Sequence, residues 1–145
     1  MANRFLAAVT LVVADYDEAI AWYVDKLGFA LIEDINLGGD KRWVTISASP
    51  LLPGYNGAGQ GSKLLLARAD RMASGEASAQ RAAIGNQTGG RVAFFLHTDD
   101  FARDHAAMLA KGVEFKEQPR YEAYGTVAVF ADLYGNLWDL IEPKR

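Results

Sequence analysis

An acidic residue lies inside a strongly apolar segment near the end of this sequence. Asp139 stands between Trp138 and Leu140 in the strand-like run 136–141. A carboxyl group in such a run is rarely buried without a reason, because burial penalises its charge. Asp139 is therefore our first candidate for a general base or for an anchor of a cationic substrate. A carboxylate that is simply hydrogen-bonded inside the fold is the alternative.

The two histidines differ in their prospects for chemistry. His97 ends the apolar run 92–97, where a neutral imidazole could act as an acid, a base or a hydrogen-bond donor. The alternative is a histidine near solvent at the end of a strand. His105 shares a predicted helix face with Phe101 and Leu109, so we expect it to be a partly buried structural residue.

Composition bounds the class of protein. The chain has 145 residues, half of them hydrophobic, and a net charge of −3 from 15 basic and 18 acidic side chains. This length predicts one domain. The absence of cysteine excludes a disulfide framework, a thiolate zinc site and a cysteine nucleophile. The basic residues are scattered, which argues against a nucleic-acid partner.

The apolar run 5–14 follows Arg4 and superficially resembles a signal peptide. It is too short to span a membrane and has no convincing cleavage site. It also belongs to an internal repeat. We therefore expect a cytoplasmic protein with no membrane partner.

The repeat is the most informative feature of the sequence. Each copy has an apolar run leading to an aspartate, a helical pattern of about three turns, a glycine where the helix should stop, and an alternating run. In the first copy the run, the aspartate, the glycine and the alternating run are residues 9–13, Asp15, Gly28 and residues 29–33. In the second copy they are residues 92–97, Asp100, Gly112 and residues 113–116.

Two further strand-like runs follow in each copy, at residues 42–47 and 63–67 and at residues 126–130 and 136–141. The chain is therefore predicted to be an α+β protein made of two βαβββ modules. The domain covers residues 1–145, with module one at about 5–70, a linker at about 71–90 and module two at about 91–145. The linker is predicted to carry a short helix around residues 78–83, and residues 51–62 are predicted to form a loop.

Each helix should cover one face of its sheet and leave the other face free, so that two modules side by side form a half-barrel around a cavity. Alternation along the strands then gives the cavity-facing residues. It places Thr10 of the first module, and Phe95 and His97 of the second, on that side. In the last strand, Asp139 shares a face with its second neighbours and not with Trp138.

Three segments carry a resemblance to a known family. They are VADYDEAIAWYVDKLGF at residues 13–29, TDD at 98–100 with GVEF at 112–115, and DLYGNLWDL at 132–140. The last is similar to the Asp-Pro-x-Gly-Asn-x-x-Glu-Leu motif of the vicinal oxygen chelate superfamily, which includes glyoxalase I, bleomycin resistance proteins and extradiol dioxygenases. The resemblance covers essentially the whole chain. It implies the paired βαβββ fold and a homodimer.

The enzymes of that superfamily typically hold one divalent metal with His, Gln or Glu from four strands. The corresponding positions here are Ala8, Ala93, leucines of the run 63–67, and Asp139. Alanine and leucine offer no lone pair, and a single carboxylate provides too few ligands for a divalent ion. We therefore expect no metal and no cofactor.

Aromatic residues are predicted to line the cavity. Trp43, Tyr121 and Tyr124 lie in or beside strands that should form its wall. The resemblance places Tyr124 where relatives often have an active-site tyrosine. Aromatic walls suit flat or apolar ligands, although ordinary core packing is the alternative.

Three functions remain open at this point. The first is metal-independent binding of a small molecule by a protein of the bleomycin-resistance type, with Thr10, Trp43, Phe95, Tyr121 and Asp139 as ligand contacts. The second is a lyase, isomerase or extradiol dioxygenase, which needs either a metal or acid–base work by Asp139 with His97 or Tyr124. The third is a structural or regulatory dimer with a closed cavity.

Overall fold

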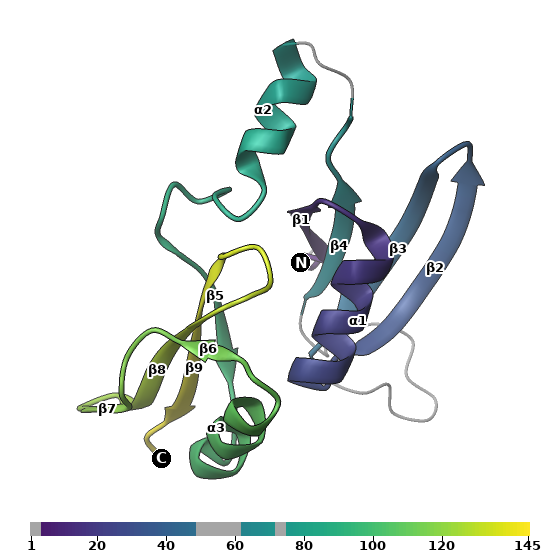
Figure 1. The fold of residues 1–145 in the computed structure, drawn as a ribbon. Coiled ribbons are helices and arrows are strands. Elements are labelled where there is room, and N and C mark those ends of the chain that lie inside the picture. Colours follow the sequence, from purple (N-terminus) through teal and green to yellow (C-terminus); the bar gives the residue numbers. More distant parts are fainter. Residues whose placement is uncertain (1–3, 49–61, 72–74) are drawn as a thin grey trace. The chain divides into compact units, whose positions relative to one another are not determined.

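The computed structural model describes residues 4–48, 62–71 and 75–145. The chain divides into two compact units, Met1–Arg81 and Ala82–Arg145. The first contains β1 (Ala8–Val13), α1 (Tyr16–Leu27), β2 (Ala30–Gly38), β3 (Lys41–Ser47) and β4 (Lys63–Arg68) (Figure 1). A further helix, α2 (Gly75–Ala83), runs across the boundary. The second unit contains β5 (Val92–His97), α3 (Phe101–Ala110), β6 (Glu114–Phe115), β7 (Arg120–Glu122), β8 (Gly125–Ala131) and β9 (Leu137–Pro143).

The first unit is a four-stranded sheet in the order β1-β4-β3-β2. β1 and β4 are parallel, and the other pairs are antiparallel. Alternate residues of the strands are buried with the apolar side of α1: Leu11, Val13, Val44, Ile46, Leu64, Leu66, Ala19 and Tyr23. We call the other side of this sheet, away from α1, the open face of the first sheet. The residues between the buried ones belong to it.

The second unit repeats this topology with one additional strand. The order is β5-β9-β8-β6, β5 and β9 are parallel, and β7 pairs with β8. A series of ring contacts joins α3 to the sheet: Phe101, His105, Phe115, Phe130, Trp138 and Phe94. His105 stacks on Phe101 with 5.1 Å between centroids and meets Phe115 edge-on at 4.5 Å. His105 therefore packs between aromatic rings, which is the structural role predicted for it from its position on the helix.

The repeat is also visible in how the two helices begin and end. Asp15 caps α1 by accepting a hydrogen bond from the backbone of Glu18, and Asp100 caps α3 by accepting one from Arg103. Gly28 and Gly112 follow the helices with φ of 73° and 84°, the left-handed region that glycine adopts without strain. The alignment of Asp100 with Asp15 is confirmed.

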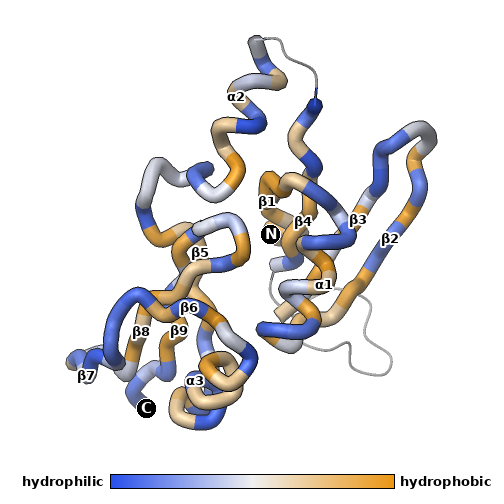
Figure 2. Tube along the Cα trace, in the orientation of Figure 1, coloured by the Kyte–Doolittle hydropathy of each residue, from blue (hydrophilic) through white to orange (hydrophobic). Residues whose placement is uncertain are grey.

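The α+β fold of two βαβββ modules is confirmed, and so is the short helix in the linker, which begins earlier than predicted. β7 was not predicted as a strand. It is short and hydrophilic (Figure 2), so it lacks the apolar run by which the other strands were recognised. Most of the predicted loop at 51–62 lies outside the described residues. No helix in the described part of the chain is long and apolar enough to cross a membrane.

Candidate functional site

Asp139 lies on the side of the second sheet that faces away from α3. In the strand pairing it is opposite Phe95 of β5 and Val129 of β8. Its neighbours Trp138 and Leu140 are buried on the α3 side, 4% and 0% exposed. The alternation predicted for the last strand is therefore confirmed. We call the side that carries Asp139 the open face of the second sheet.

The Asp139 carboxyl group has no hydrogen-bond partner for one of its oxygens. Oδ1 is buried, and no described residue donates a hydrogen bond to it. Burial raises the pKa of Asp139 above its ordinary value of 3.8; the positive charge of Arg120 opposes this effect and the negative charge of Glu117 adds to it. An acceptor of this kind is costly unless a donor reaches it.

Arg120 brings further polar groups to the same face. It pairs with Val127, which pairs with Ile141, two residues along β9 from Asp139. Its guanidinium group donates to Glu117 from Nε at 2.7 Å and to Glu122 from Nη1 at 3.0 Å. Hydrogen bonds to Glu117, to Glu122 and then to Tyr124 raise the pKa of Arg120. Arg120 therefore links Tyr124 to Glu117 and Glu122 by hydrogen bonds.

Three other candidates of the second unit lie on two different faces of its sheet. His97 pairs with Ile141 and is exposed, so it shares the face of Asp139 at the end of β5. Phe95, on the same face, is 63% exposed. Tyr121 pairs with Thr126, on the opposite face of β7 from Arg120, and is 82% exposed. Asp139, Phe95 and His97 therefore share one face of the second sheet, and Tyr124 is linked to that face through Arg120. Tyr121 lies on the opposite face of β7.

The remaining candidates, Thr10 and Trp43, belong to the first unit. Thr10 pairs with Leu65 on the open face of the first sheet, and Trp43 pairs with Ile35 across β2 and β3. Sequence reasoning missed two charged residues of this unit, Glu33 and Lys63, which meet there. It also missed Arg120. Each of these is a charged side chain in a strand, where a surface ion pair is the ordinary expectation.

The residues do not fit the divalent metal of the superfamily's enzymes. Ala8, Ala93 and the leucines of β4 cannot ligate, which leaves only the Asp139 carboxylate. Ala93 lies at a bulge, since Val92 pairs with Leu137 and Phe94 with Trp138. Among residues 4–48, 62–71 and 75–145, no three His, Cys, Asp or Glu side chains form a group that could hold an ion. We derive no chemistry through a metal.

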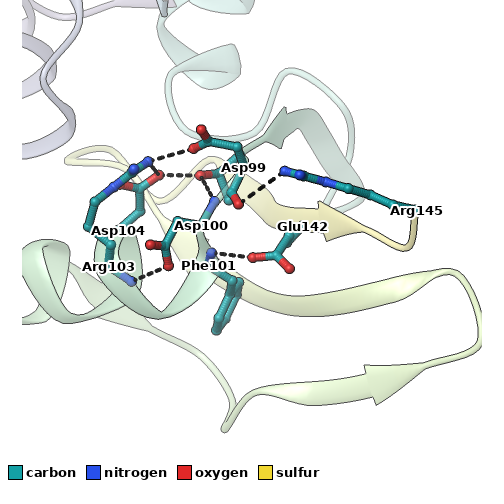
Figure 3. Close-up of polar contacts among 8 residues, drawn as sticks. Asp99, Asp100, Phe101, Arg103, Asp104, Glu142 and Arg145 are labelled. Atoms are coloured by element: carbon teal, nitrogen blue, oxygen red, sulfur yellow. Dashed lines mark hydrogen bonds and ion pairs between the residues drawn. The ribbon is translucent and has the colours of Figure 1, made fainter.

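A second polar cluster joins the end of β9 to the start of α3 (Figure 3). Glu142 accepts a hydrogen bond from the backbone N–H of Phe101 at 2.8 Å, and Arg145 donates to the carbonyl of Asp99. Arg103 bridges Asp99 and Asp104. A shallow hollow of about 460 Å³ lies beside it, lined in part by Asp99 and Glu142. These carboxylates already have partners within the unit, so the cluster is structural.

Comparison with known proteins gives this fold a family. An uncharacterised protein of Shewanella frigidimarina is 53% identical over 97% of this chain and 94% of its own length. The crystal structure of UcmS2 is 26% identical, covers 97% of this chain and 99% of its own, and superposes with a TM-score of 0.77. TnmS3, described as an antibiotic binding protein from Streptomyces sp. CB03234, is 24% identical, covers 99% of both chains and has a TM-score of 0.69.

The match to the family itself spans nearly the whole sequence. Residues 5–140 match the Glyoxalase/Bleomycin resistance protein/Dioxygenase superfamily. That stretch includes the first βαβββ module and all of the second except the last three residues of β9, and it contains the aspartate of that strand. The chain therefore belongs to the Glyoxalase/Bleomycin resistance protein/Dioxygenase superfamily.

Proposed function

We propose that the chain binds a small organic molecule on the open face of the second sheet, without a metal. The observation that carries this proposal is the buried Oδ1 of Asp139, which no described residue satisfies. Rotation of the carboxyl group would bring this oxygen to the open face, where a hydroxyl or N–H group of the ligand would donate to it. The bond would remove a penalty that is typically about 1–3 kcal/mol for an unsatisfied buried group.

The surroundings of Asp139 support a mixed polar and apolar ligand. Phe95 offers an exposed ring at the neighbouring position of β5. Arg120 offers fixed donors on the other side, because Glu117 and Glu122 hold its guanidinium group. A few well-placed polar groups among apolar side chains are typical of small-molecule sites. TnmS3, an antibiotic binding protein of this fold, is an example of the fold in such a role.

Acid–base catalysis is a second candidate, favoured by the pKa of Asp139. Burial raises this pKa above its ordinary value, towards the range in which a carboxyl group exchanges protons with a substrate. Asp139 would take a proton from a bound substrate, and His97 or Tyr124 on the same unit would return one. This chemistry corresponds to a lyase or isomerase that needs no metal.

We further propose that the protein is a cytoplasmic homodimer. The edge strand β2 supports association, because its side chains Leu31, Ile35 and Leu37 are 42%, 49% and 57% exposed. An edge strand with exposed apolar residues readily pairs with another chain. Light scattering after size exclusion should give twice the mass of one chain.

The binding proposal is tested with matched probes that differ in one donor. We expect 2-naphthol to raise the melting temperature of the protein more than 2-methoxynaphthalene does, since only the former donates to Asp139. Asp139→Leu, which removes the acceptor at similar size, should reduce the response to 2-naphthol to that of the ether. Asp40→Leu, in the turn between β2 and β3, is the matched control and should respond like the wild type. No stabilisation by either compound, or an unchanged response in Asp139→Leu, would contradict the proposal. Turnover that depends on Asp139 would favour the catalytic candidate.

A further inference from the structure

Glu33 is turned onto the open face of the first sheet by an irregularity in β2. Leu31 pairs with Ile46 of β3, but Glu33 pairs with Thr45, so β2 has one additional residue between them. Ile46 and Thr45 are consecutive and point to opposite faces. The bulge therefore moves Glu33 away from the α1 side. Bulges commonly re-aim a side chain in this way near functional sites.

Three donors converge on one oxygen of the Glu33 carboxylate. Oε1 accepts from the hydroxyl of Thr45 at 3.0 Å, from the indole Nε1 of Trp43 at 3.4 Å and from Nζ of Lys63 at 3.5 Å. Within the described part of the chain, nothing donates to Oε2. The Glu33 side chain is 36% exposed to solvent. The carboxylate is thus held in place through one oxygen while the other can accept a new bond.

This carboxylate is ionised at neutral pH. The hydrogen bond from Thr45 lowers the pKa of Glu33 most; burial opposes it, and Trp43 and Lys63 lower the pKa further. Lys63 is its one cationic partner in the described residues, at the long distance of 3.5 Å. A loose and partly exposed pair of this kind leaves much of the negative charge available to another cation.

The surface around Glu33 combines an aromatic ring with aliphatic and hydroxyl side chains. Thr45 pairs with Leu65, and Leu65 with Thr10, so one row of side chains crosses the sheet from Glu33 on β2 to β1. Trp43, 39% exposed, adjoins the row through its bond to Glu33. An indole ring attracts a cation near its face and also offers area to an apolar group.

We propose that Glu33 and Trp43 form a binding site for a protonated amine that carries an apolar or aromatic group. The ammonium group donates to Oε2 of Glu33, and the apolar part lies against Trp43 and Leu65. A charged donor is favoured over a neutral one because charge-assisted hydrogen bonds are the stronger kind. This site belongs to the first unit and does not depend on the role proposed for Asp139.

The test uses the full chain labelled with nitrogen-15 and two probes of similar shape. They are 2-phenylethylamine, protonated at pH 7, and the neutral 2-phenylethanol. The indole N–H signal of Trp43, assigned with Trp43→Phe, reports binding. We expect the amine to shift this signal at concentrations where the alcohol does not. Equal shifts by both probes, or no shift by the amine, would overturn the proposal.

Variants separate a binding role from a structural one. Glu33→Gln should weaken amine binding about fivefold, while Glu76→Gln on α2, which removes the same charge, should not. Lys63→Met should strengthen amine binding about threefold, because it removes the competing ammonium group. If Glu33 serves only to form the ion pair with Lys63, then Glu33→Gln and Lys63→Met both leave amine binding unchanged, and the proposal is wrong. Asp139→Asn should leave the Trp43 response unchanged, so failure of either proposal can be told from failure of the other.

Discussion

The buried carboxylate of Asp132 holds Asn136 at two points. Its Oδ1 accepts the backbone N–H of Asn136 at 2.9 Å, and its Oδ2 accepts the side-chain amide at 2.8 Å. Oδ1 also accepts the backbone N–H of Tyr134 at 2.9 Å. The Asp-to-Asn segment of the superfamily motif is therefore a closed turn. It fixes where β9 begins, and hence where Asp139 lies.

Asp132→Ala should lower the free energy of unfolding by about 3 kcal/mol, because it leaves buried donors of Asn136 without an acceptor. Urea unfolding followed by circular dichroism measures this change. Asp40→Ala, at an exposed turn, should change the free energy by less than about 0.5 kcal/mol. Equal losses in the two variants would show that the turn does not depend on the carboxylate.

The two helix caps should contribute equally to stability, because they occupy equivalent positions of the repeat. Asp15→Ala and Asp100→Ala should each cost about 1 kcal/mol of unfolding free energy. Asp15→Asn and Asp100→Asn should cost much less, since the amide oxygen can still accept the capping bond. Thermal unfolding of the four variants checks this. A loss in the Asn variants as large as in the Ala variants would assign the effect to charge instead of capping.

The stability of the protein should depend on pH through Asp139 with an unusual sign. Its pKa is raised in the folded state, so the folded protein binds this proton more tightly than the unfolded chain. The stabilisation of the folded state by this proton is complete at pH values below the ordinary pKa of 3.8. It is lost as the pH rises through the raised pKa of the folded state. The wild type should therefore lose stability relative to Asp139→Asn over this range, measured by urea unfolding at a series of pH values.

Asp104 is the internal control for that experiment. Burial raises its pKa, but hydrogen bonds from Arg103 and Thr98 outweigh burial and lower it overall. The wild type should gain stability relative to Asp104→Asn as the pH rises towards the ordinary value, and keep it above that value. Slopes of the same sign in both comparisons would contradict the raised pKa of Asp139.

Added metal should not stabilise the protein. We expect no stoichiometric ion by mass spectrometry and no change in melting temperature with nickel, zinc, manganese or ferrous iron. A stabilising ion would show that ligands exist beyond the donors identified, and would move the proposal to a metal-dependent lyase or dioxygenase. Loss of such an effect in Asp139→Asn would locate the ion at that carboxylate.

The face of Asp139 could be predicted because the pattern of β9 is unbroken. Trp138 and Leu140 alternate with Asp139, and the strand pairs without irregularity to β8. The repeat likewise predicted an aspartate just before each helix, and an aspartate at that position has a defined local role as a cap. Period and local hydrogen bonding are properties of short segments, so one sequence is sufficient to predict them.

Glu33 could not be predicted in the same way. Strict alternation places Leu31 and Glu33 on one face, and the bulge between them reverses this. Whether a strand bulges depends on its pairing with β3, which the sequence of β2 alone does not contain. Arg120 was missed because β7 was not predicted as a strand, and only its pairing with β8 places Arg120 on the face of Asp139.

The parallel pairing in each unit has a consequence for folding. The first strand of each unit pairs with its last, so that Ala8 lies opposite Lys63 and Val92 opposite Leu137. Contacts between residues so far apart in the chain form slowly, because the loop between them must close first. During synthesis on the ribosome, β1 cannot pair until β4 has been made. Until then, the apolar side chains of Leu11 and Val13 are not yet buried by the residues that cover them in the folded protein. The nascent chain is therefore most exposed to aggregation before the last strand of each unit emerges.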